Sequence, residues 1–122
     1  MELALIISDK RFKRAVDLFN SEDWYPAHDA FEELWHETYG KERITLQAFL
    51  QIAVAQLHLE RGNTNGATIL FGEALGRLTK LDAPDLGFDI VRLSECLEQC
   101  LNSLQRNNQP EKSNIPYLCK KY

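Results

Sequence analysis

The sequence has little of what marks secreted, membrane or nucleic-acid-binding proteins. It has 3 cysteines, an odd number without a CxxC pair, so neither a disulfide framework nor a cysteine metal site is expected. Lys and Arg number 14 against 18 Asp and Glu, for a net charge of -4. Without clustered excess positive charge, we expect no nucleic acid and no anionic membrane as a partner. No apolar run approaches the length that spans a bilayer.

The apolar run at residues 1–7 also lacks the marks of an export signal. It is too short, Glu2 stands where a basic flank belongs, and no small-residue cleavage site follows. Cys96 and Cys100 are one helical turn apart on an apolar face, which is typical of reduced core thiols. These features together predict a cytoplasmic protein.

Helical periodicity predicts an all-α protein. With 122 residues, 44% hydrophobic and 26% charged, the chain has the composition of one globular domain. Ser8 is the predicted cap of the first helix, and Leu81 the last buried residue of the fourth. The chain is divided into a helical domain, residues 1–106, and a polar C-terminal tail, residues 107–122. The predicted helices are residues 8–20, 25–39, 44–61, 63–81 and 88–106.

An internal repeat becomes visible when the chain is shifted by 40 residues. Phe31 then falls on Phe71, and the capping residue Asp23 falls on Asn63. The coincidence of apolar and capping positions predicts two equivalent helical hairpins, followed by a C-terminal helix. We therefore predict a compact array of five helices.

Polar residues at the packing faces of two helices form a candidate functional cluster. His28 and Glu32 are one turn apart at the edge of the apolar arc of helix 25–39. Helix 44–61 carries a narrow polar stripe flanked by apolar residues on both sides. Such a stripe is expected to be partly buried, so its side chains need hydrogen-bond partners. The cluster consists of His28, Glu32, Trp35, Gln47, Gln51 and His58.

We favour a structural interpretation, in which these groups satisfy one another as a buried polar network that fixes the helix register. The alternative is a divalent metal ion held by His28, Glu32 and His58, with an open position for water. His36 is two turns from His28, too far to share one ion, and the H-E-x-x-H motif is absent. No cofactor is therefore expected.

The turn Arg61, Gly62 and Asn63 precedes helix 63–81. Gly62 suits a left-handed position after a helix and Asn63 suits an N-cap, and these two roles explain the turn. The functional alternative is anion binding at the N-terminus of that helix, together with Arg61.

Several motifs of this chain resemble those of the domain-of-unknown-function family numbered 309. The resemblance covers about residues 19–81 and implies a compact five-helix array without an established activity, although members are sometimes labelled as possible metal-dependent hydrolases. Glycine is more usual where this chain has Glu22-Asp23, so that turn is expected to differ slightly. The motifs are Ala27-His28 with Glu32 and Trp35, Leu50-Gln51-Ile52-Ala53 with His58, and Arg61-Gly62-Asn63 with Gly66-Ala67.

Three functions from different classes are compatible with these residues. A helical interaction module that binds a protein partner is the function we favour. The alternatives are a metal-dependent hydrolase, for which the sequence offers a partial ligand set, and a small-molecule-binding protein lined by the polar stripe. No catalytic Ser or Cys arrangement is present, so covalent catalysis is not expected.

Overall fold

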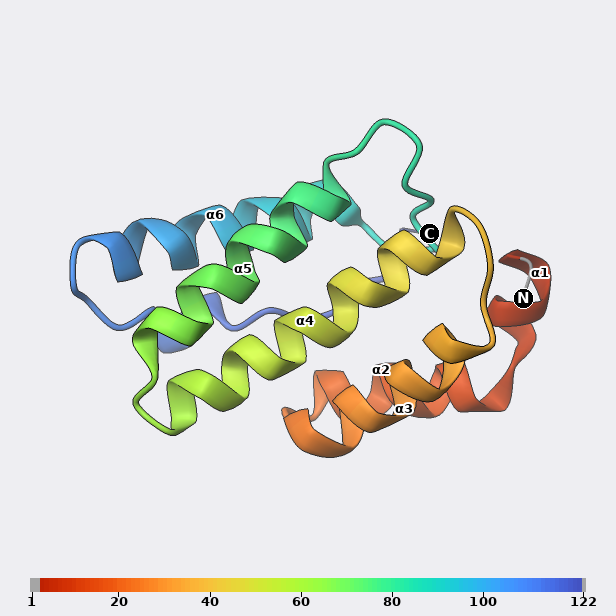
Figure 1. Ribbon diagram of the computed structural model, residues 1–122, viewed down its shortest axis with the longest axis horizontal. Coiled ribbons are helices and arrows are strands. Elements are labelled where there is room, and N and C mark those ends of the chain that lie inside the picture. The colour runs from red at the N-terminus through yellow and green to blue at the C-terminus, as the bar shows by residue number, and fades with distance from the viewer. Residues whose placement is uncertain (1–2, 122) are drawn as a thin grey trace.

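The computed structural model describes residues 3–121, and this part of the chain is built from helices (Figure 1). The predicted all-α class is confirmed, but the predicted count of five was wrong, because six α-helices occur within the described residues. None of the helices in that range is both long and apolar enough to cross a membrane. The bounds are α1 Leu3–Ser8, α2 Lys10–Asn20, α3 Trp24–His36, α4 Glu42–Glu60, α5 Thr64–Leu78 and α6 Ile90–Gln105, followed by the 3-10 helix η1 Lys112–Asn114.

The predicted first helix, residues 8–20, corresponds to α2, and a short additional helix, α1, precedes it because the chain turns at Asp9. The Asp9 carboxylate accepts a hydrogen bond from the backbone amide of Arg11 at 2.8 Å, and Asp9 itself has an extended backbone. Asp9 is therefore the N-cap of α2. Ser8, the predicted cap, is instead the last residue of α1. Hydrogen bonds from the Arg11 side chain and amide also hold the pKa of the Asp9 carboxyl below its usual value.

The fourth and fifth predicted helices are shorter than their apolar patterns indicated. The structure ends α5 at Leu78, and Leu81, which was assigned to the buried stripe, is fully exposed. Phe88 is buried outside α6, in an isolated antiparallel bridge. Asp89 caps α6, so this helix begins at Ile90.

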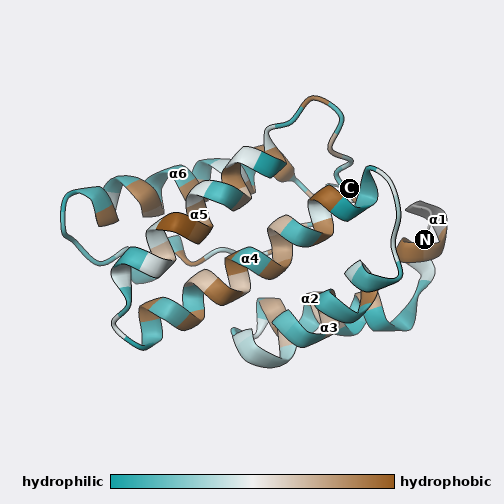
Figure 2. Ribbon diagram, in the orientation of Figure 1, coloured by the Kyte–Doolittle hydropathy of each residue, from teal (hydrophilic) through white to brown (hydrophobic). Residues whose placement is uncertain are grey.

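Consecutive helices pack against one another, with α4 between α3 and α5 (Figure 1). Hydrophobic residues recur along each helix with hydrophilic residues between them (Figure 2). Aromatic rings form the centre of the core, where Phe31 of α3 contacts the rings of Phe12 and Phe19 of α2 and of Phe49 of α4. The three ring centroid distances are 6.3, 6.2 and 5.6 Å, so edge-on aromatic packing joins α2, α3 and α4.

Residues 107–121, called here the C-terminal segment, pack back on the helices. The side chain of Asn20 in α2 exchanges two hydrogen bonds with the backbone of Leu118, at 3.0 and 2.7 Å. The backbone amide of Lys121 donates to the carbonyl of Gly87 at 2.9 Å. Leu118 is buried, so this polar stretch of sequence contributes to the core.

The α2–α3 and α4–α5 turns have the same backbone conformation, 40 residues apart. Glu22 and Gly62 both adopt a left-handed φ, of 62° and 75°. The next amide, of Asp23 or Asn63, donates to the carbonyl five residues earlier at 2.9 or 2.8 Å. The expected difference between the two turns is therefore confined to their side chains: Asn63 makes a capping hydrogen bond, and Asp23 makes none.

Candidate functional site

A continuous row of polar and aromatic side chains runs along α3. The rings of Tyr25 and His28 have centroids 6.2 Å apart. Nε2 of His28 lies 3.0 Å from one carboxylate oxygen of Glu32, and the other oxygen lies 3.8 Å from Nε2 of His36. These contacts form because residues three and four apart share one face of a helix. Two of the three predicted residues of α3, His28 and Glu32, thus lie in this part of the row.

The row continues onto the first turn of α4 through an aromatic contact. The rings of Trp35 and His36 have centroids 5.0 Å apart, and the guanidinium carbon of Arg43 lies 3.8 Å from the Trp35 ring centroid. At this distance the cation is attracted to the face of the indole. We call this set the α3 row. It consists of Tyr25, His28, Glu32, Trp35, His36 and Arg43.

Two members of the α3 row were missed by sequence reasoning. Tyr25 lies three residues before His28, a spacing that could have found it. Arg43 lies one turn before Gln47 on the polar stripe of α4, but its stacking on Trp35 depends on how α3 packs against α4. The sequence pattern predicts which face of each helix is buried. Which residue of α4 contacts which residue of α3 depends on how the two helices pack.

The structure leaves four buried side-chain polar atoms without a hydrogen-bond partner, as far as the described residues go, and all four belong to α3 and α4. Native proteins pair nearly all such atoms, so each exception needs an explanation. Asp29 has a carboxylate oxygen 3.3 Å from Nδ1 of His28, but this contact lacks hydrogen-bond geometry. The four atoms are Nδ1 of His28, Nε1 of Trp35, Nε of Arg43 and Oε1 of Gln51.

The sequence predicted one polar network, but Gln51 and His58 of the α4 stripe do not pair with His28 and Glu32. Gln51 is buried and donates from Nε2 to the carboxylate of Glu73 on α5 at 2.9 Å. His58 has its Nδ1 3.1 Å from the amide nitrogen of Asn63, and Gln47 is half-buried. These polar groups therefore form separate pairs. Gln51 and His58 have partners in α5 or just before it, whereas His28 contacts Glu32 within α3.

The alternative metal ligands do not converge. Across residues 3–121, no three His, Cys, Asp or Glu side chains are placed to hold one metal ion. His28 and Glu32 contact each other, whereas His58 contacts Asn63 at the start of α5. This donor arrangement does not fit the divalent ion of the alternative interpretation, since a site needs its ligands within about 2.2 Å of a common point.

Asn63, the last residue of the Arg61 to Asn63 turn, has a structural role as the N-cap of α5. Its side-chain oxygen accepts a hydrogen bond from the amide of Gly66 at 2.9 Å. A Cβ added to Gly66 would lie 2.6 Å from the side-chain amide nitrogen of Asn63 and 3.1 Å from the His58 ring, so any larger residue there would displace the Asn63 cap. An anion at the start of α5 would have to compete with the Asn63 cap. These contacts support the structural interpretation of the turn.

Two comparisons with known proteins bear on this region. Residues 12–70 match the model of a family described as a domain of unknown function, DUF309. The chain is also 31% identical over 94 residues to the uncharacterized protein YpuF of Bacillus subtilis (strain 168). That alignment covers 74% of this chain and 53% of YpuF, so the chain spans about half the length of this relative. The resemblance to DUF309 that the motifs predicted is therefore confirmed by a match over residues 12–70.

Proposed function

We propose that this chain is a protein-interaction module that binds its partner through the α3 row. The observation that carries the proposal is the contiguity of the row, in which Tyr25 is 57% exposed and Arg43 stacks on Trp35. Tyr, Trp and Arg are the residue types that contribute most to binding at protein interfaces. A surface that places all three next to one another is suited to anchor a partner.

The unpaired polar atoms support this assignment. A buried polar atom without a hydrogen bond costs roughly 1–3 kcal/mol, and folded proteins keep few of them. Three of the four atoms found here belong to the row itself, on His28, Trp35 and Arg43. Because these atoms are covered, a partner's backbone carbonyls reach the indole and guanidinium donors only when the side chains of the row change rotamer on binding.

The position of the cavities favours a protein over a small molecule as the ligand. One cavity of about 430 Å³ lies between α2 and residues 86–88, and another of about 190 Å³ lies between α6 and the C-terminal segment. Neither is lined by a residue of the α3 row. Small molecules bind in concave sites, whereas a row of side chains along a helix suits a protein surface. The small-molecule alternative is therefore the second candidate.

The proposal includes the helical-hairpin repeat that the sequence predicted. Its support is the shared conformation of the α2–α3 and α4–α5 turns, whose hydrogen bonds match position by position after a shift of 40 residues. Helical-repeat proteins bind partners through the surfaces that stacked hairpins present. In this chain the α3 row lies on the first of the two hairpins.

Site-specific photocrosslinking in cells of the source organism can identify the partner. A benzophenone side chain at position 39, where Tyr39 is 77% exposed directly after α3, is expected to capture a partner protein. The matched control is position 91 on α6, where Val91 is 70% exposed. Equal capture of the same protein from both positions would contradict the proposed face.

Affinity measurements with the purified partner then test the row itself. Tyr25→Ala and Arg43→Ala are each expected to raise the Kd about tenfold, since each removes an interface anchor. Val91→Ala serves as the control and should leave the Kd unchanged. Thermal unfolding of all three variants establishes that the fold is kept. An unchanged Kd in both folded row variants would refute the interaction assignment.

A further inference from the structure

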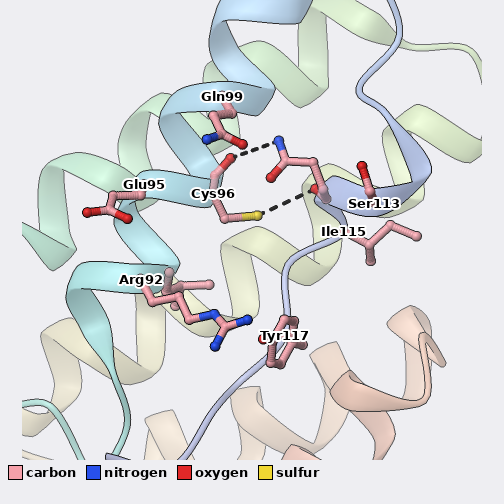
Figure 3. A pocket seen from close by; sticks show the side chains of 9 residues that line it. Arg92, Glu95, Cys96, Gln99, Ser113, Ile115 and Tyr117 are labelled. Carbon is pink, nitrogen blue, oxygen red and sulfur yellow. Dashed lines mark hydrogen bonds between the residues drawn. The ribbon is translucent and has the colours of Figure 1, made fainter.

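Two thiols of α6 hold the C-terminal segment at a single carbonyl oxygen. The Sγ atoms of Cys96 and Cys100 each donate to the backbone oxygen of Asn114, at 3.4 Å in both cases. The side-chain amide of Asn114 donates in return to the backbone oxygen of Cys96 at 3.3 Å (Figure 3). Because the cysteines are four residues apart, both thiols point from one face of α6. We call this arrangement the Asn114 clasp.

The two thiols of the clasp differ in their access to solvent. Cys100 is fully buried, whereas Cys96 is half-buried. Cys96 also lines the cavity of about 190 Å³, whose wall includes Arg92 from α6 and Ser113 from η1 (Figure 3). A small reagent can therefore approach the Cys96 sulfur from the cavity, but the structure offers it no comparable route to Cys100.

The chemistry of the pair also distinguishes Cys96. Once Cys96 has lost its proton, the Cys100 thiol can donate to the Cys96 sulfur instead of to Asn114, and this hydrogen bond lowers the pKa of Cys96. Burial opposes this effect, and the positive charge of Arg92 adds to it. The same hydrogen bond, together with burial, raises the pKa of Cys100. Of the two thiols, Cys96 therefore loses its proton first. Because the thiolate is the nucleophile, Cys96 is the reactive sulfur of the pair.

We propose that Cys96 is a thiol-modification site, and that its reaction with a low-molecular-weight disulfide detaches the C-terminal segment from α6. The Cys96 thiolate attacks one sulfur of the disulfide, and a new sulfur–sulfur bond forms as the reagent's own bond breaks. Cys96 is oxidised to a mixed disulfide. The departing half of the reagent leaves with the electron pair, is reduced to a thiol and takes up the proton that Cys96 gave.

Modification weakens the clasp in two ways. The modified sulfur has no hydrogen left to donate to the Asn114 carbonyl. That carbonyl then keeps only one of its two thiol donors, Cys100. The added group also has to lie in the cavity of about 190 Å³ beside Cys96, where its bulk presses on Ser113, Ile115 and Tyr117. Residues 112–117 must therefore move away from α6, which strains the neighbouring bonds between Leu118 and Asn20.

Peptide mapping after treatment with glutathione disulfide tests the site. The full chain is used with Cys119→Ser, which removes the other half-buried thiol. We expect one adduct, on Cys96, while Cys100 stays unmodified until the chain is unfolded. Cys96→Ser, which keeps a hydroxyl donor to the clasp, should take up no glutathione.

Hydrogen exchange followed at single amides tests the consequence. In the modified protein the Leu118 amide should exchange on the order of tenfold faster, while amides of α4 keep their rates. Reduction with dithiothreitol should restore the slow rate, and Cys96→Ser treated in the same way should never lose it. An adduct on Cys100 in the folded chain, no adduct at all, unchanged exchange at Leu118, or equal acceleration in α4 would each overturn the proposal.

Discussion

The three glycines within α5 have different surroundings. Gly66 has no room for a side chain, because a Cβ there would press on Asn63 and His58. Gly72 and Gly76 lie on the exposed side of the same helix, and a Cβ at either position would meet nothing within 4 Å. Two glycines one turn apart on a helix can allow another backbone to come close. The structure shows no such contact at this pair, so both glycines only weaken the helix.

Alanine substitution should therefore have opposite effects along α5. Gly72→Ala and Gly76→Ala should each raise the free energy of unfolding by about 0.5–1 kcal/mol, because alanine loses less conformational freedom on folding. Gly66→Ala should lower it by about 1 kcal/mol or more, because its Cβ disrupts the Asn63 cap. Chemical denaturation of the three variants measures these differences. A Gly66→Ala protein as stable as the parent would show that the cap is unimportant.

At the scale of elements, the two left-handed turns form a matched pair. Glu22 and Gly62 occupy the same conformation, but a residue with a side chain pays about 1–2 kcal/mol to adopt it. A Cβ at Gly62 would have open space around it, so backbone strain alone decides the outcome there.

Exchanging the residue types of these turns is expected to shift stability in opposite directions. Glu22→Gly should raise the free energy of unfolding by about 0.5–1 kcal/mol, the relief of strain being partly offset by the greater freedom of glycine in the unfolded chain. Gly62→Ala should lower it by about 1 kcal/mol. Thermal or urea unfolding distinguishes the two. Loss of stability in Glu22→Gly would mean that the Glu22 side chain makes a contact of greater value than the strain.

The elements also show what the sequence could predict. The apolar stripes predicted most of the helical segments, because burial of one helix face places apolar residues in the sequence at a period of 3.6 residues. Helix α1 was missed because its apolar run is too short to show a helical period, and the end of α5 was missed because Leu81 continues the apolar stripe. The candidate site was predicted in part. His28 and Glu32 pair as neighbours within a helix do, whereas the pairing of Gln51 with Glu73 depends on packing between helices.

For the molecule as a whole, we expect no stoichiometric transition metal after purification without chelator. His58 lies with Asn63 rather than with His28, so no chelating set is formed from the described residues. Elemental analysis measures the metal content directly. Zinc should raise the Tm of the parent no more than that of His28→Gln. A one-to-one zinc, iron or manganese content that disappears in both His28→Gln and His58→Gln would make the metal-dependent hydrolase the leading hypothesis.

The hydrogen bonds between Asn20 and Leu118 join residues 98 positions apart. During synthesis, α2 and α3 can pack through local contacts while most of the chain is still absent. The partner of Asn20 emerges from the ribosome 98 residues after Asn20 itself. Until then the polar side chain of Asn20 depends on water, and the surface that Leu118 covers stays open. This step of folding therefore waits for residue 118, and a nascent protein stalled before that position exposes a surface that the folded chain hides.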